Sequence, residues 1–190
     1  AEFLSSVEDA DLGQLIGFCG AEQGHMIVGL EGSARRAVLD AAIEEADKEA
    51  AAIASADGDP RIALVGEFVD INNLIETNVE GALNSNLAFY GGLVDGRAFD
   101  GALSEEQILS DVWSQEQEIR ESTTEWIYSF LFMAYQPLAD ADLQAYIAFS
   151  ETEAGGEINR AMFESFDRLF TGISHSLGRA AANEMTMQEL

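Results

Sequence analysis

Proline, cysteine and basic residues are all scarce in this chain. Its 190 residues include two prolines, one cysteine and nine lysines and arginines together. Because proline ends or kinks helices, its scarcity leaves room for long ones. A lone cysteine excludes an intramolecular disulfide. No apolar run approaches the roughly 18 residues that a membrane-spanning helix needs, so we predict no membrane insertion.

The shortage of basic residues leaves a large excess of acid. Thirty-five aspartates and glutamates give a formal net charge of −26, and the excess runs through the whole chain. Nucleic-acid binding needs a basic face, so we expect no nucleic-acid partner. The same charge opposes docking on anionic lipid. Two interpretations of the acidic residues stay open. They form a surface that keeps the protein soluble, or they form a docking face for a basic protein or for cations.

Apolar residues recur at helical spacing along the whole chain, which predicts an all-α protein. The clearest break lies before Pro60, where Asp59 is a natural N-cap and proline fits the first helical position. We predict a single domain, an antiparallel assembly of six or seven helices. Its central helices are expected at 60–92 and 105–136, with glycines ending the first. A helix over 153–183 is expected to be amphipathic.

A short internal repeat links the two ends of the chain. Residues 9–12 recur as residues 140–143, and the same offset of 131 gives nine identities over residues 9–27. Average composition would give about one or two. We therefore predict a duplicated helix hairpin, with copies near 6–56 and 139–183. Cys19 aligns with Ser150 and His25 with Gly156, which argues against a duplicated catalytic site.

The second copy of this hairpin also carries a family resemblance. Residues 149–156 follow an Asp-Leu helix start and precede a long amphipathic helix. This segment resembles the bacterial family known as domain of unknown function 2059, over roughly residues 105–183. The resemblance implies an exported all-helical protein of the Gram-negative periplasm, with no established activity. The chain begins without methionine, and we expect a periplasmic or secreted protein whose signal peptide has been removed.

Few residues form a pattern that catalysis or metal binding requires. Glu22 and His25 have the Glu-x-x-His spacing of di-iron bundles, but such a site needs two of these motifs. The other histidine, His175, has no acid three residues before it. A reactive thiol at Cys19 would need a nearby base, and its sequence neighbours supply none. We predict no catalytic residues, no metal and no cofactor.

Two asparagines fall within the apolar stripe of the first central helix. Asn72 and Asn86 must be hydrogen-bonded if they are buried there. In the structural reading they set the register between helices by bonding across them. In the functional reading they orient a ligand bound in an apolar groove.

These observations lead to one main functional hypothesis and one alternative. The main hypothesis is an exported, non-enzymatic helical protein that acts by binding a protein partner or a further copy of itself. The alternative is a small-ligand carrier or an enzyme with its site between the two helix hairpins.

Overall fold

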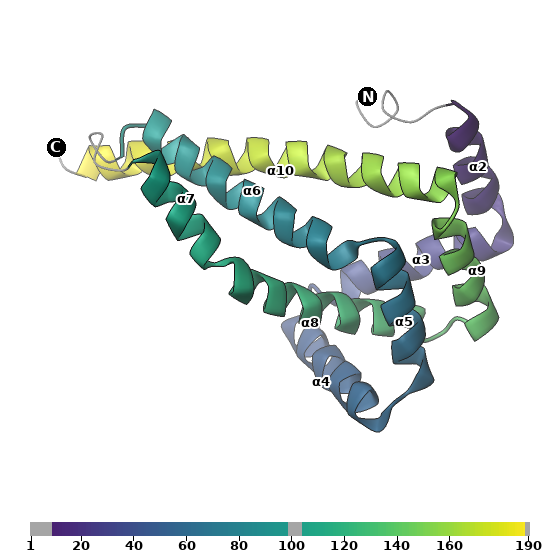
Figure 1. The fold of residues 1–190 in the computed structure, drawn as a ribbon. Helices are drawn as coiled ribbons and strands as arrows, with labels where there is room; N and C mark the ends of the chain where they lie inside the picture. Colours follow the sequence, from purple (N-terminus) through teal and green to yellow (C-terminus); the bar gives the residue numbers. More distant parts are fainter. Residues whose placement is uncertain (1–8, 99–103, 189–190) are drawn as a thin grey trace. The chain divides into compact units, whose positions relative to one another are not determined.

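The computed structural model describes residues 9–98 and 104–188, and these residues form α-helices without any strand. The predicted all-α class is therefore confirmed (Figure 1). The helices are α2 (Asp9–Gly20), α3 (Glu22–Ala37), α4 (Ala41–Asp57), α5 (Pro60–Ile71), α6 (Leu74–Asp95), α7 (Glu105–Ser114), α8 (Glu116–Tyr135), α9 (Asp140–Ser150) and α10 (Glu153–Gln188).

There are more helices than the six or seven predicted, because the expected long helices are interrupted over one to three residues. The stretch over 60–92 breaks at Asn72, which closes α5, and at Asn73, whose φ is 50°. The stretch over 105–136 breaks at Gln115, between α7 and α8. Breaks this short leave the apolar periodicity almost unchanged, so the sequence pattern does not reveal them.

The described chain divides into two compact units. Among the described residues, unit 1 consists of residues 9–75 and 122–162, and unit 2 of residues 76–98, 104–121 and 163–188. The polypeptide passes from one unit to the other within α6, α8 and α10.

The main hydrophobic core lies in unit 1, where the end of α8 is buried on nearly every side. Tyr135 and Leu143 are completely buried, and the Phe68 ring meets the Tyr135 ring edge-on at 5.6 Å. Burying large apolar and aromatic side chains in this way is the main source of folding free energy. The remaining buried members of this core are Ile27, Ala34, Val65, Val69, Ile127, Phe130, Leu131, Ala134, Leu138 and Ile147.

The internal repeat is visible in the helix bounds. Helices α3 and α10 start 131 residues apart, at Glu22 and Glu153, which is the offset of the sequence repeat. Each copy has a glycine one turn into its second helix, Gly24 and Gly155. A Cβ at Gly24 would collide with the carbonyl oxygen of Phe18, and one at Gly155 with that of Phe149. Both glycines are therefore needed for the sharp corner between the paired helices.

The two copies also pack against each other within unit 1. The Phe18 and Phe149 rings, which are equivalent in the repeat, are stacked with centroids 4.2 Å apart and planes 10° apart. Gln23 Nε2 donates to Asp142 Oδ1 at 2.9 Å and so joins the first copy to the second. The copies differ in length, since α3 ends at Ala37 while α10 continues to Gln188.

Candidate functional site

Helix α10 packs against α6 in unit 2 through very small residues. A Cβ at Gly178 would collide with the carbonyl oxygen of Phe89, and one at Gly92 with that of His175. A Cβ at Gly96 would overlap the side chain of Ala182. Gly178 and Ala182, four residues apart, lie on one face of α10, and Gly92 in α6 and Gly96 directly after it meet that face, which lets the two backbones approach closely. The two helices run side by side in Figure 1.

These contacts also correct the predicted end of the first central helix. Glycines 91 and 92 do not end it, because α6 continues to Asp95. Gly92 is a packing residue within the helix, in close contact with α10. His175 on α10 adds a polar contact at the same place, with Nε2 3.0 Å from Asp95 Oδ2.

The opposite face of α10 carries large apolar side chains in contact with water. We call it the α10 stripe. Counting about 100° per residue puts its members within one arc of about 100°, opposite Ala182. The Phe166 and Phe170 rings stack on each other at 6.1 Å. Its members, with their exposed fractions, are Phe166 (45%), Leu169 (53%), Phe170 (52%), Ile173 (53%) and Leu177 (60%).

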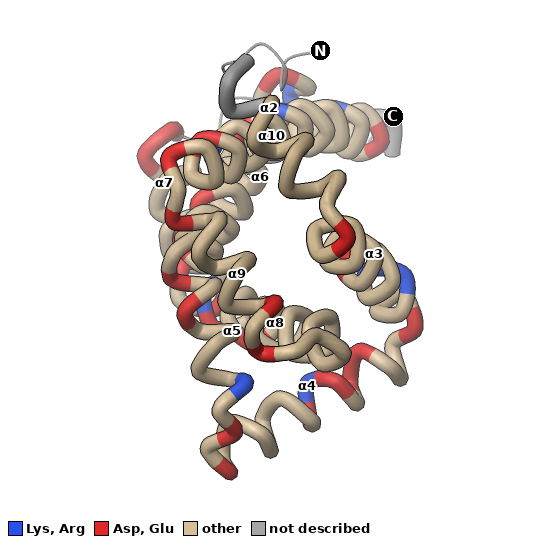
Figure 2. Tube along the Cα trace, turned by 90° about the vertical axis from the view of Figure 1, so that its right-hand side faces the viewer, with Lys and Arg blue, Asp and Glu red and all other residues tan. Residues whose placement is uncertain are grey.

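No charged residue lies on the α10 stripe. Residues 163–183 contain two acids, Glu164 and Asp167, and two bases, Arg168 and Arg179, so their net charge is zero. By helical spacing all four lie about 110° or more from the centre of the stripe. Elsewhere acidic residues outnumber basic ones on the helices of both units (Figure 2). The stripe is therefore a neutral apolar surface on a strongly acidic protein.

The structure places the two predicted asparagines in different units. Asn72 is buried in unit 1, where its Nδ2 donates to Phe68 O at 2.9 Å and its carbonyl oxygen accepts from Asn159 Nδ2 at 2.9 Å. Asn86 lies in unit 2 and donates from Nδ2 to Gln115 Oε1 at 3.0 Å. Both amides thus bond to the protein itself. A ligand-binding role for Asn72 and Asn86 stays a prediction.

Unit 1 contains a polar cluster that the sequence analysis missed. Tyr135 on α8 donates its hydroxyl to Glu31 Oε1 on α3 at 2.7 Å, and Tyr146 on α9 also hydrogen-bonds to Glu31. Burial raises the pKa of Glu31, while the bonds from Tyr135 and Tyr146 and the charge of Arg35 act in the opposite direction. The three residues come from three helices, so no spacing in the sequence could have signalled the cluster.

The ionisable side chains in this cluster, and Cys19 near Glu31, favour their protonated forms. The cluster is therefore a poor source of a nucleophile. Burial and the neighbouring Glu31 raise the pKa of Cys19, which keeps it a thiol at neutral pH. Burial also raises the pKa of both Tyr135 and Tyr146, so their hydroxyls remain neutral donors.

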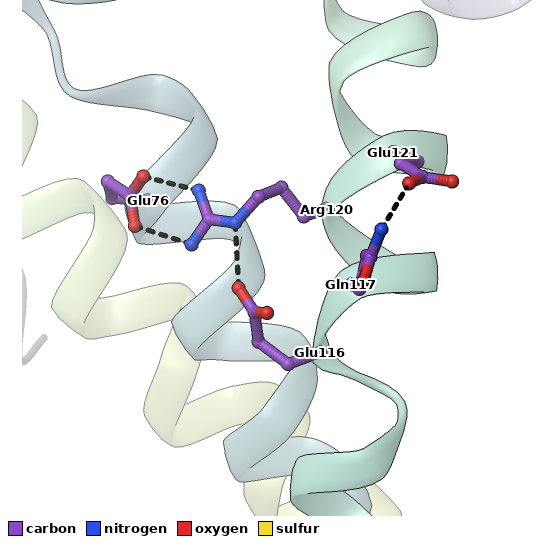
Figure 3. A network of polar contacts seen from close by, with 5 residues as sticks. All are labelled: Glu76, Glu116, Gln117, Arg120 and Glu121. Atoms are coloured by element: carbon purple, nitrogen blue, oxygen red, sulfur yellow. Dashed lines mark hydrogen bonds and ion pairs between the residues drawn. The ribbon is translucent and has the colours of Figure 1, made fainter.

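A second polar network lies in unit 2, where Arg120 joins α8 to α6 (Figure 3). Arg120 pairs through both terminal nitrogens with the carboxylate of Glu76, with Nη2 2.8 Å from Oε2, and its Nε donates to Glu116 at 2.7 Å. These hydrogen bonds lower the pKa of Glu76 and raise that of Arg120. The network is open to solvent, so it fixes helix geometry more than it adds stability.

Two particular kinds of site are absent from the described residues. No group of three or more His, Cys, Asp and Glu side chains there is placed to hold a metal ion. None of the described helices combines the length and apolarity needed to cross a membrane. Comparison of the chain with known protein families, with characterised proteins and with solved structures finds no match.

Proposed function

We propose that this protein has a non-enzymatic function and acts by binding a protein partner through the α10 stripe. The observation that carries the proposal is the exposure of the five stripe residues, each 45–60% open to water. Single exposed apolar residues are ordinary, but a contiguous row of them bounded by polar residues is typical of an interaction surface.

The other face of α10 supports this interpretation. The close glycine contacts with α6 already occupy the inner face, so the stripe is not needed to hold α10 in unit 2. Positions 166, 169, 170, 173 and 177 have the three- and four-residue spacing by which helices dock on one another. A partner that covers the stripe would remove five large apolar side chains from water.

An exported location for this function is part of the proposal. The acidic composition with a single lysine supports it. The experiment below does not depend on the location.

The proposal is tested by photo-crosslinking in cells that naturally make the protein. Benzoylphenylalanine replaces Phe170 in the stripe or, as a control, Leu39, which is 84% exposed and lies in unit 1. We expect a discrete crosslinked adduct from position 170 that Leu169→Ser abolishes, and no such adduct from position 39. The absence of any adduct specific to position 170 would contradict the proposed function.

A further inference from the structure

We infer that the partner that covers the α10 stripe is the α10 stripe of a second copy of this chain, related by a two-fold axis. The inference rests on the proposed function, because it names the partner for that surface. Two-fold pairing buries the same patch on both copies, so one self-complementary surface is sufficient.

The size of the stripe fits a dimer interface. Free aromatic side chains present about 150–250 Å², so half exposure leaves roughly 100 Å² on each of Phe166 and Phe170, and the three aliphatic members, exposed to a similar fraction, leave an area on the order of the same size each. Two stripes together would remove roughly 1,000 Å² of apolar surface from water. Apolar atoms make up about 65% of a homodimer interface, which gives a total of about 1,500 Å². Stable interfaces bury about 1,200–2,000 Å².

The charge distribution permits two copies to pair at the α10 stripe. Two copies of a chain with a net charge of −26 repel each other, but residues 163–183 carry no net charge. The charged residues of this segment lie away from the stripe, and Arg168 is already close to Glu164, with Nη2 3.9 Å from Oε2. At physiological salt the more distant acids are screened beyond about 8 Å. A second copy can therefore dock on a segment that carries no net charge.

The same charge distribution allows an experiment to distinguish a second copy of the chain from a basic protein as the partner. Salt weakens the attraction between opposite charges, so a complex with a basic protein would loosen as salt is added. Salt also weakens repulsion between like charges, so self-association through a neutral stripe would tighten. The sign of the salt dependence therefore identifies the occupant.

The test is sedimentation equilibrium of the full chain, from about 1 to 200 μM and from about 0.05 to 0.5 M salt. We expect the mass to rise from 20.5 kDa to twice that value, with a dissociation constant that falls several-fold as salt increases. The double variant Leu169→Ser/Ile173→Ser should weaken the dimer at least about 30-fold, as loss of central interface residues does. The control Leu39→Ser should leave it unchanged.

Circular dichroism distinguishes a loss of pairing from a loss of folding. Leu169 and Ile173 are each about half exposed, so the double variant should keep its helix content. A chain that stays monomeric throughout would overturn the inference, as would a dimer that the double variant leaves intact or that dissociates as salt is added. A monomer that still gives the position-170 adduct with another protein overturns the inference alone. A monomer without that adduct overturns the proposed function as well.

Discussion

Gly178→Ala is expected to destabilise unit 2, whereas Gly172→Ala, six residues earlier in the same helix, is expected to stabilise it. A Cβ at position 178 would collide with the backbone of Phe89, which cannot move without separating α6 from α10. Overpacking of this kind costs about 1–3 kcal/mol, and more where backbone is the obstacle. Alanine gains about 1 kcal/mol over glycine in a helix, so we expect a net loss of about 2 kcal/mol.

Gly172 is the matched control. It is exposed, and a Cβ there would have no other atom within 4 Å. Only the helix propensity then changes, and Gly172→Ala should gain about 0.5–1 kcal/mol. Chemical denaturation followed by circular dichroism measures both differences. Equal effects at the two positions would mean that the close approach of α6 and α10 does not exist in solution.

Tyr135→Phe is expected to destabilise unit 1 by about 1 kcal/mol or more, because a hydrogen bond contributes about 0.5–1.5 kcal/mol and one to a charged group about 1.5–3 kcal/mol. Tyr135 is fully buried and donates its hydroxyl to Glu31. The variant keeps the ring in the core and removes only this donor. Tyr128→Phe, which alters a less buried tyrosine with no bond to Glu31, is the control and should cost less.

The pH dependence of stability gives a second measure of the same cluster. The folded-state pKa of Glu31 lies above its ordinary value of 4.5, so the folded protein binds this proton more tightly than the unfolded chain does. The resulting stabilisation is complete below pH 4.5 and is lost as pH rises through the folded-state pKa. Glu31→Gln abolishes this titration, so its stability relative to the wild type should rise over that interval. If the difference in stability between Glu31→Gln and the wild type does not change with pH, Glu31 is not buried as described.

The sequence predicts the presence of the helices well, but it predicts less well the residues at which they end. Part of the repeat can be followed in the structure, because the offset of 131 in the identities reappears in the starting residues of α3 and α10 and in Gly24 and Gly155. The glycines before Asp95 were misread because glycine commonly ends a helix. Gly92 serves close packing within α6 instead, whereas Gly96 follows Asp95 directly and so lies where the helix ends, while also packing against Ala182.

The candidate site could be predicted only in part. Apolar residues on one face of the last helix are evident in the sequence, but the same pattern describes a buried face and an exposed one. Whether this face is buried or exposed depends on how α10 packs against α6 through Gly178. That contact joins segments far apart in sequence. The side-chain bond of Asn86 also depends on a residue outside its helix, Gln115, whereas the side chain of Asn72 bonds to Phe68 O in its own helix and only its backbone carbonyl oxygen accepts from the distant Asn159.

The most direct test of the central claim, that the α10 stripe is an open surface which a partner covers, is thiol labelling beside the stripe. Ser176 is exposed at its edge, and Ser33 on α3 is a matched control. Each hydroxyl donates to the carbonyl oxygen four residues earlier, Ser176 to Gly172 at 2.9 Å and Ser33 to Gly29 at 2.8 Å. Cys19→Ser provides the background, since serine stands at the equivalent position of the second repeat.

The measurement compares maleimide labelling rates of Ser176→Cys and Ser33→Cys in dilute and concentrated protein. We expect similar rapid labelling at both positions in dilute solution, because both residues are exposed. At high concentration labelling should slow at position 176 alone, as the stripe becomes covered. A cysteine at position 176 that is protected at every dilution would show that the chain itself buries this face, which would contradict the account.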